Sequence, residues 1–182
     1  MKLLICSDIH GDFECAKKVL SEFDRHRAGK LLILGDVLYH GPRNDLPAGY
    51  NPKSVISLLN ERRDAILCVR GNCDTEVDGM VLSFPVLCEF AYISDDLVRM
   101  FATHGHKFNL ENLPPLCKGD ILLHGHTHVP AFSEFGNSNV YINPGSVSIP
   151  KEGNPPTYII YENGCFSLFS LDGELISVYK HV

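Results

Sequence analysis

The sequence predicts an α/β fold, and three observations support that prediction. Over the first 74 residues, short apolar runs alternate with segments of helical spacing, which is the pattern of parallel β-α-β units. The apolar runs are continuous, as is typical of parallel strands that are buried on both faces. Near the end of the chain, Asn163-Gly164 and Asp172-Gly173 are tight-turn signals between apolar runs, and these indicate antiparallel strands.

The first half of the chain is expected to contain three strands and two helices. The predicted strands cover residues 2–7 (KLLICS), 30–34 (KLLIL) and 65–69 (AILCV). The predicted helices cover residues 14–28, where apolar side chains recur on one face, and residues 54–62, with Pro52 just ahead of the start and Ser54 as the candidate cap.

The second half is expected to be rich in strands. They are predicted at residues 86–93, 98–103, 120–123, 140–142, 157–162 and 165–171. No internal repeat, low-complexity segment or linker interrupts the chain. We therefore expect a single domain over residues 1–182.

Composition and charge narrow the functional classes. The chain has a net charge of −6 and is 45% hydrophobic, which is ordinary for a globular protein, whereas a duplex nucleic-acid binder normally carries a basic face. The seven cysteines are odd in number and form no C-x-x-C pair, so we expect a reducing cytoplasm and no disulfide scaffold. No apolar run approaches the roughly 20 residues of a transmembrane helix, so no membrane partner is expected.

Polar side chains follow the predicted strands at five places. They are Asp8 and His10, Asp36, Asn72, His104, and finally His126 and His128. Because ligands bind beyond the carboxyl ends of strands in open α/β sheets, these groups could meet at one rim. Mixed oxygen and nitrogen donors suit Mn²⁺, Fe²⁺, Zn²⁺ or Co²⁺, and two such ions can clamp a phosphoryl group and activate water.

Each of these residues also has an ordinary structural explanation. A single Asp after a strand usually caps a helix or forms a turn, and Asn72 alone would be a turn residue. A lone H-x-H pair is more often structural than a metal site. The occurrence of all seven residues together favours the metal site.

The order of the motifs resembles the calcineurin-like metallophosphoesterase family. That family has D-x-H, G-D, G-N-[HC]-[DE], a His-Gly segment and G-H-x-H in this order. They stand here as Asp8-Ile9-His10, Gly35-Asp36, Gly71-Asn72-Cys73-Asp74, His104-Gly105-His106 and Gly125-His126-Thr127-His128. Over essentially its whole length the chain is similar to the small YfcE-type bacterial phosphodiesterases, which share GDVLYHGPRNDLPAGYNP, RGNCD, ATHGH followed by ENLP, and NPGSVSIPKEGNP.

The resemblance implies a four-layer αββα sandwich of two mixed sheets flanked by helices. It implies one divalent cation held by Asp8, His10, Asp36 and His128, and a second held by Asp36, Asn72, His104 and His126. Mn²⁺ is the first expectation, with Zn²⁺, Fe²⁺ or Co²⁺ as alternatives. The implied reaction is hydrolysis of a P–O bond in a small phosphodiester by a hydroxide that bridges the two ions. The predicted catalytic residues are Asn72, Cys73, Asp74 and His104.

Cys73 departs from the pattern of the broader family, in which many members have His at this position. In those members the His lies near the substrate phosphate and is thought to protonate the leaving group. A thiol with an ordinary pKa near ~8.5 is a weaker acid and a poor cation. We therefore expect diesters with good leaving groups to be preferred over alkyl monoesters.

The loop of residues 39–51 is the expected specificity element. The predicted substrate-binding residues are His40, Arg43 and Tyr50 of this loop, together with Cys73. Arg can hold phosphate oxygens through two parallel hydrogen bonds. The alternative for Arg43 is an ion pair with Asp45 or another carboxylate.

Further polar residues are expected to support the site. Asp12 and Asp74 are candidates to orient His or Asn ligands, and His124 could do the same. His106 could support a ligand, contact the substrate or be an ordinary polar residue. The turn of residues 143–146 (NPGS) is expected to support the G-H-x-H loop from beneath.

Other functions compete with this hypothesis. A retromer subunit of eukaryotes shows that the family fold can serve as a non-catalytic binding scaffold, and a phosphomonoesterase is another alternative. A carbon–nitrogen hydrolase with similar ligands is mostly a β/α barrel of about 250 residues, which is longer than this chain. Formation of a homo-oligomer through the C-terminal strands is a further candidate property.

Overall fold

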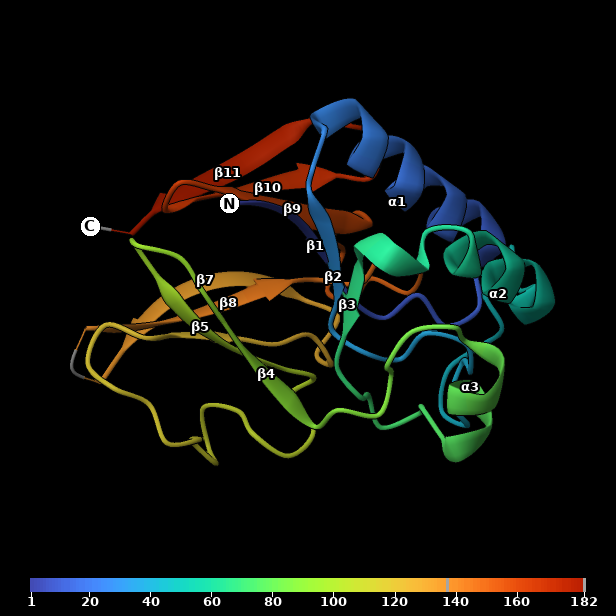
Figure 1. The fold of residues 1–182 in the computed structure, drawn as a ribbon, viewed down its shortest axis with the longest axis horizontal. Coiled ribbons are helices and arrows are strands. Elements are labelled where there is room, and N and C mark those ends of the chain that lie inside the picture. The colour runs from blue at the N-terminus through green and yellow to red at the C-terminus, as the bar shows by residue number, and fades with distance from the viewer. Residues whose placement is uncertain (137, 182) are drawn as a thin grey trace.

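The computed structural model describes residues 1–136 and 138–181 and contains two β-sheets packed face to face (Figure 1). The six-stranded sheet has the order β11-β10-β9-β1-β2-β3. Its strands are β1 (Lys2–Cys6), β2 (Lys30–Ile33), β3 (Ile66–Cys68), β9 (Thr157–Glu162), β10 (Cys165–Ser170) and β11 (Leu175–Lys180). The five-stranded sheet has the order β4-β5-β6-β8-β7. Its strands are β4 (Phe90–Ser94), β5 (Arg99–Thr103), β6 (Ile121–Leu123), β7 (Pro130–Phe135) and β8 (Asn139–Pro144).

Both sheets are mixed. Strands β1, β2 and β3 run parallel, as the first half of the sequence predicts, and β9 joins the other side of β1 in the antiparallel direction. In the second sheet β5, β6 and β8 are parallel, while β4 and β7 are antiparallel edge strands. The hairpin between β9 and β10 turns at Asn163 and Gly164, whose φ angles are 49° and 77°, as the Asn-Gly signal requires.

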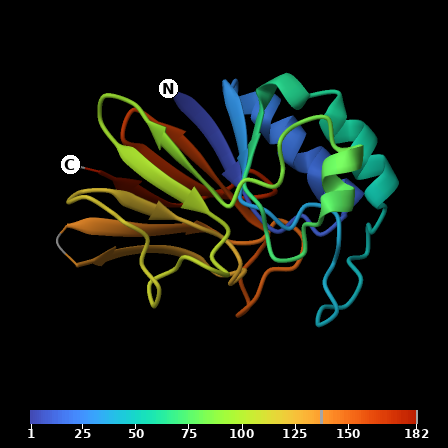
Figure 2. The same ribbon diagram turned by 60° about the horizontal axis from the view of Figure 1, so that its bottom comes forward.

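Helices α1 (Phe13–His26) and α2 (Pro52–Asn60) lie on the outer side of the six-stranded sheet (Figures 1 and 2). Helix α1 is capped by Asp12, whose carboxylate accepts hydrogen bonds from the backbone N–H groups of Cys15 (2.9 Å) and Gly49 (3.3 Å). Asp12 therefore joins the start of α1 to the loop of residues 39–51. Both of these contacts are with backbone N–H groups rather than with a His or Asn ligand, which Asp12 was expected to orient. The cap of α2 is Asn51, which accepts from Ser54 N–H at 3.2 Å, so the expectation of Ser54 as the cap was wrong.

The centre of the six-stranded sheet, at β1 and β2, is buried on both faces, which explains the continuous apolar runs of these strands. On β1, Leu4 and Cys6 belong to the core under the helices. Leu3 and Ile5 alternate with them and belong to the core between the two sheets. Both cores form without disulfides, because all seven cysteines are free.

Helix α3 (Glu76–Val81) and strands β7 and β4 are among the elements that differ from the prediction. Helix α3 is a single short helix stabilised by a capping box between Thr75 and Asp78, and its Gly79 and short length conceal it in the sequence. Strand β7 begins at Pro130 and is an edge strand, where proline is tolerated but weakens the sequence signal. Strand β4 begins only at Phe90, whereas a strand was expected from residue 86.

The predicted fold class, an α/β sandwich of two mixed sheets, is confirmed, although it contains few helices. The structure places no helix after α3 in the part of the chain that it describes. Part of the outer face of the five-stranded sheet is instead covered by the segment of residues 104–120 (Figure 2). Phe108 of that segment packs edge-on to Phe101 of β5 with a ring distance of 5.5 Å, and Tyr92 donates a hydrogen bond to the Pro115 carbonyl at 3.0 Å.

Within the described residues, none of the helices has the length and apolar character required to cross a bilayer.

Candidate metal centre

The seven predicted ligands lie beyond the carboxyl ends of five strands, and the two sheets bring these ends together. They follow β1 (Asp8 and His10), β2 (Asp36), β3 (Asn72), β5 (His104) and β6 (His126 and His128). The first two loops are joined directly, because the N–H groups of Asp8 and His10 donate to the carbonyls of Gly35 and Asp36 at 3.1 and 2.9 Å. The location expected from open α/β sheets is therefore the one observed.

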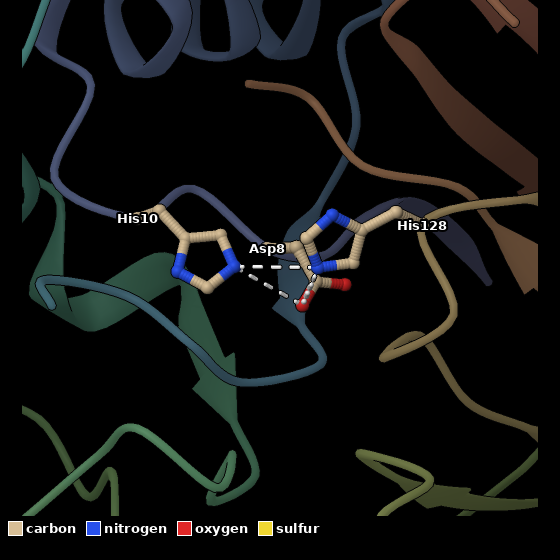
Figure 3. Close-up of side chains that lie close together, drawn as sticks. All are labelled: Asp8, His10 and His128. Carbon is tan, nitrogen blue, oxygen red and sulfur yellow. Dashed lines mark hydrogen bonds and ion pairs between the residues drawn. The ribbon is translucent and has the colours of Figure 1, made fainter. Parts of the chain in front are cut away.

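The first cluster consists of Asp8, His10 and His128, which point toward one another (Figure 3). Nε2 of His10 lies 3.4 Å from Nε2 of His128. Oδ1 of Asp8 lies 3.6 Å from Nε2 of His10 and 3.3 Å from Nε2 of His128. Ligands placed at about 2.0–2.2 Å from one cation would have comparable mutual distances.

The second cluster shares Asp36 with the first. Oδ2 of Asp36 is 3.7 Å from Nε2 of His10 and 3.5 Å from Nε2 of His104, so it lies between the two clusters. Nε2 of His104 in turn is 3.0 Å from Oδ1 of Asn72 and 3.1 Å from Nδ1 of His126. This is the arrangement expected of a carboxylate that bridges two cations.

The carboxylate of Asp8 provides a test of whether a cation fits. Asp8 is fully buried, and its Oδ1 has no hydrogen-bond donor among the described residues. An ionised oxygen in that position is unfavourable unless it is paired or bound to a metal. Because the imidazole nitrogens of two ligands face the same oxygen, the donor set fits a divalent cation.

Backbone carbonyls fix the orientation of three of the imidazole rings. Nδ1 of His10 donates to the Tyr39 carbonyl at 2.7 Å, Nδ1 of His104 to the Leu34 carbonyl at 2.6 Å, and Nδ1 of His128 to the Ile149 carbonyl at 2.5 Å. A proton on Nδ1 leaves the lone pair on Nε2, which is the atom that faces the centre. These three rings are therefore held in the tautomer that binds a metal through Nε2.

The ligand loops have an unusual backbone conformation. Nine non-glycine residues of the described chain have positive φ, and five of them are predicted ligands. They are Asp8 (57°), His10 (49°), Asp36 (55°), His126 (68°) and His128 (62°). This conformation costs about 1–3 kcal/mol per residue and concentrates at functional sites. Glycine would relieve the strain but would remove the ligand.

Asp74 is buried behind the ligands and organises their loops. Its carboxylate accepts hydrogen bonds from the N–H groups of Asp36 (2.8 Å), Val37 (2.9 Å) and Gly71 (2.7 Å). Burial raises the pKa of this carboxyl to about 6. Through these hydrogen bonds, Asp74 joins the loop after β2 to the loop after β3.

The turn of residues 143–146 contacts the ligand loops as expected. Asn143 donates to the Gly125 carbonyl at 3.0 Å, and the hydroxyl of Ser146 donates to the Asp8 carbonyl at 2.9 Å. His124 is buried against the Tyr141 ring at 4.4 Å, and burial lowers the pKa of its imidazole to about 4. His106 is half-buried, and its ring lies 5.4 Å from that of His104.

A pocket of about 540 Å³ opens beside the ligands. It is lined by Asp36, Gly41, Pro42, Arg43, Asn44, Asn72, Cys73, His126, Thr127, His128 and Lys151. Of the predicted substrate-binding residues, Arg43 and Cys73 are in this lining. His40 and Tyr50 are outside it and pack edge-on against each other at 5.4 Å.

Lys151 is a lining residue that the sequence reasoning missed. It follows the NPGS turn in the segment PKEGNP, which the sequence indicated only as part of the family resemblance. Its distance in sequence from every predicted ligand gave no indication that it shares a pocket with Arg43. Hydrogen bonds that join Lys151 and Ile149 to His128 bring this segment beside the His128 loop.

Burial and neighbouring charges shift the pKa values of the side chains in the centre. Burial opposes ionisation of Asp8, but the imidazoles of His10 and His128 hold the pKa of its carboxyl well below the usual range. Burial also opposes protonation of His104, yet the carboxylates of Asp36 and Asp8 raise the pKa of its imidazole to about 9. Burial and repulsion from His104 lower the pKa of His126 to about 4.

We predict that the affinity for Mn²⁺ rises with pH between about pH 6.5 and 8.5. Without a cation, the His104 imidazole is protonated below about pH 9. A cation that binds this imidazole must displace the proton, and displacement becomes easier as the pH rises. Each displaced proton therefore raises the affinity by up to about tenfold per pH unit. Titration calorimetry in two buffers of different ionisation enthalpy would measure both the affinity and the released protons. His26→Gln, on α1, should keep the same slope, and an affinity that is flat or falls over this range would contradict the assignment.

We predict that Gly71→Ala lowers the affinity for the metal by at least about tenfold. A Cβ on Gly71 would overlap Oδ1 of the Asp36 carboxylate, so the bridging position must shift. Gly29→Ala is the matched control, because its Cβ would make only an ordinary contact of 3.6 Å with the Lys2 carbonyl. Equal metal affinities for the two variants in a competition titration with a chelator would show that Gly71 does not position Asp36.

Comparison with known proteins agrees with this geometry. The profile of the calcineurin-like phosphoesterase superfamily domain matches residues 1–163. Phosphodiesterase YfcE of Escherichia coli K12 is 47% identical over 176 residues, which cover 97% of this chain and 95% of that protein.

Solved structures show the same fold. The structure of YfcE, a phosphoesterase from E. coli, superposes with a TM-score of 0.96 at 46% identity and covers 100% of both chains. Vacuolar Protein Sorting 29 from Cryptosporidium parvum has a TM-score of 0.64 at 19% identity, covering 98% of this chain and 97% of that one, which indicates a shared fold only. The matched profile and the E. coli relative show that this chain belongs to the calcineurin-like phosphoesterase superfamily.

Proposed function

We propose that this protein is a phosphodiesterase that uses two divalent cations. The observation that carries the proposal is the position of Asp36 Oδ2, which lies 3.7 Å from a nitrogen of His10 in one cluster and 3.5 Å from a nitrogen of His104 in the other. The name of the E. coli relative, phosphodiesterase YfcE, supports the same activity.

The seven ligands are assigned to the two cations as the family resemblance implies. Asp8, His10 and His128 hold one, Asn72, His104 and His126 hold the other, and Asp36 is shared. Bound divalent cations would supply a Lewis acid for the phosphoryl group and activate water as the nucleophile. The oxygen and nitrogen donors are compatible with Mn²⁺, which we propose first, and with Zn²⁺, Fe²⁺ or Co²⁺.

The chain's own residues orient the reacting groups. Nδ2 of Asn72 donates to Sγ of Cys73 at 3.2 Å, which turns the amide oxygen toward Nε2 of His104. The Cys73 N–H donates to Oδ1 of Asp36 at 2.8 Å, which leaves Oδ2 of that carboxylate directed at the two clusters. Asn72 and Cys73 therefore set the geometry of the bridging region as well as lining the pocket.

The Cys73 side chain favours diesters as substrates. Burial raises the pKa of its thiol, and the neighbouring Asp36 carboxylate raises it further, so the thiol is neutral and a weak proton donor in this surrounding. A monoester with an alkyl leaving group needs a strong proton donor at departure. A diester with an acidic leaving group needs this help less.

We propose the remaining properties from the sequence. They are a single catalytic domain over residues 1–182, a small phosphodiester substrate, a cytoplasmic location and a homo-oligomer that uses the C-terminal strands. The seven free cysteines support the reducing compartment. The exposed Leu175, Ile176 and Val178 of edge strand β11 support the oligomer.

The proposed function is tested with purified protein that has been stripped of metal by a chelator. Hydrolysis of bis(p-nitrophenyl) phosphate is expected to return on addition of Mn²⁺ and to differ among Mn²⁺, Zn²⁺ and Mg²⁺. Asp8→Asn should lower kcat by at least about 100-fold because it removes a charged ligand, while the exposed substitution Asp24→Asn should not. A protein that stays inert to diesters with every ion would reject the proposal and favour a non-catalytic scaffold.

The role of Cys73 is tested by Cys73→His. We expect the ratio of kcat/KM for the alkyl monoester glycerol 1-phosphate to that for bis(p-nitrophenyl) phosphate to rise by about tenfold or more. Only the alkyl alcohol needs a proton as it leaves, and an imidazolium is a stronger acid than a neutral thiol. Cys88→His, at an exposed position outside the pocket, is the control and should leave the ratio unchanged. No change in either rate for Cys73→His would show that residue 73 does not act on the leaving group.

A further inference from the structure

The pocket beside the metal ligands contains two cationic side chains, Arg43 and Lys151. Within residues 1–136 and 138–181, no carboxylate lies within 4.0 Å of either cationic group. The expected alternative for Arg43, an ion pair with Asp45, is therefore not formed. Both cations are available to an anion that enters the pocket.

Lys151 is fixed to one of the metal ligands through its backbone. Its N–H donates to the His128 carbonyl at 3.2 Å. Its own carbonyl accepts from the backbone and side-chain N–H groups of Asn154 at 3.1 and 2.9 Å. These bonds close a tight turn in which Glu152 and Gly153 both have positive φ. The start of the lysine side chain therefore has a defined position relative to His128.

Arg43 belongs to a different segment of the lining, and the residues next to it, Gly41 and Asn44, make defined contacts. Gly41 lies against Cys73, since a Cβ at Gly41 would come within 3.1 Å of Sγ. The side chain of Asn44 donates to the His40 carbonyl at 2.8 Å and so closes the turn that contains Arg43. One cation thus comes from the loop after β2 and the other from the segment after β8.

The charge of the scissile group does not account for these two cations. A phosphodiester carries one negative charge, and two divalent cations at the ligand clusters would already face it. Arg and Lys are the side chains that most often bind phosphate oxygens, Arg through two parallel hydrogen bonds and Lys as a compact charge. The pocket volume of about 540 Å³ is within the usual range of about 300–1,000 Å³ for sites that hold small molecules.

We propose that Arg43 and Lys151 bind a second phosphate group of the substrate, one that is not cleaved. The preferred substrate is then a diester whose alcohol part carries an additional phosphate, such as a phosphorylated nucleotide ester. This inference rests on the proposed phosphodiesterase function and specifies its substrate class.

The test compares two diesters that differ only in the second phosphate. They are thymidine 5′-(p-nitrophenyl phosphate) and the same compound with a 3′-phosphate. The native protein with Mn²⁺ should have a kcat/KM about tenfold higher for the phosphorylated ester, mainly through a lower KM, since a charge-assisted contact is worth about one order of magnitude in affinity. Lys151→Met and Arg43→Met should each reduce this preference toward unity.

Lys118→Met is the matched control. Lys118 is exposed and lies outside the pocket, so its loss should leave the preference at the native value. The proposal is overturned if the native protein does not prefer the phosphorylated ester. It is equally overturned if Lys151→Met lowers kcat/KM for both esters by the same factor, because the cations would then serve the scissile phosphate.

A binding measurement separates this proposal from the proposed function. Titration calorimetry should show that thymidine 3′,5′-bisphosphate binds about tenfold tighter than thymidine 5′-monophosphate, and that Lys151→Met removes the difference. If the native protein hydrolyses neither ester, the phosphodiesterase function fails, and the calorimetric comparison still decides whether the second phosphate is bound. Equal affinities for the two nucleotides would reject the phosphate site even if both esters are hydrolysed.

Discussion

The Asp8 carboxylate is the constraint on which the centre depends. It is fully buried, and its Oδ1 has no donor among the described residues. A buried charge of this kind is tolerated only when another charge compensates it. The imidazoles of His10 and His128 face that oxygen through Nε2, while their Nδ1 atoms are occupied by backbone carbonyls. A divalent cation satisfies the oxygen and both nitrogens together, which no single proton can do.

The surrounding loops hold this arrangement against its own strain. Five ligands have left-handed backbone conformations, at about 1–3 kcal/mol each. Hydrogen bonds between the loops offset part of this strain. The N–H groups of Asp8 and His10 bond to the loop after β2, and the Asp74 carboxylate binds three N–H groups from two loops. Gly71 allows the close approach, because any side chain there would collide with Asp36.

The sequence predicted the parts of the molecule that have local signals. Continuous apolar runs revealed β1, β2 and β3, and Asn163-Gly164 revealed the β9–β10 hairpin. The ordered ligand motifs indicated the residues that follow strand ends, and strand ends of one sheet share an edge. The packing of the two sheets then brings the residues after β1, β2 and β3 together with those after β5 and β6. Features that depend on tertiary packing had no such signal. Strand β7 is stabilised by pairing with β8 despite its proline, and the place of Lys151 in the pocket follows from a backbone contact with a distant loop.

The two sides of the pocket are linked to the same pair of ligands. The Tyr39 carbonyl, at the start of the loop that contains Arg43, accepts from His10. The Ile149 carbonyl, two residues before Lys151, accepts from His128. Both rings face Oδ1 of Asp8, so a cation held by their Nε2 atoms would also restrain the Tyr39 and Ile149 carbonyls to which their Nδ1 atoms donate. The predicted metal ligands and the two segments that carry Arg43 and Lys151 are therefore joined by hydrogen bonds into one connected unit.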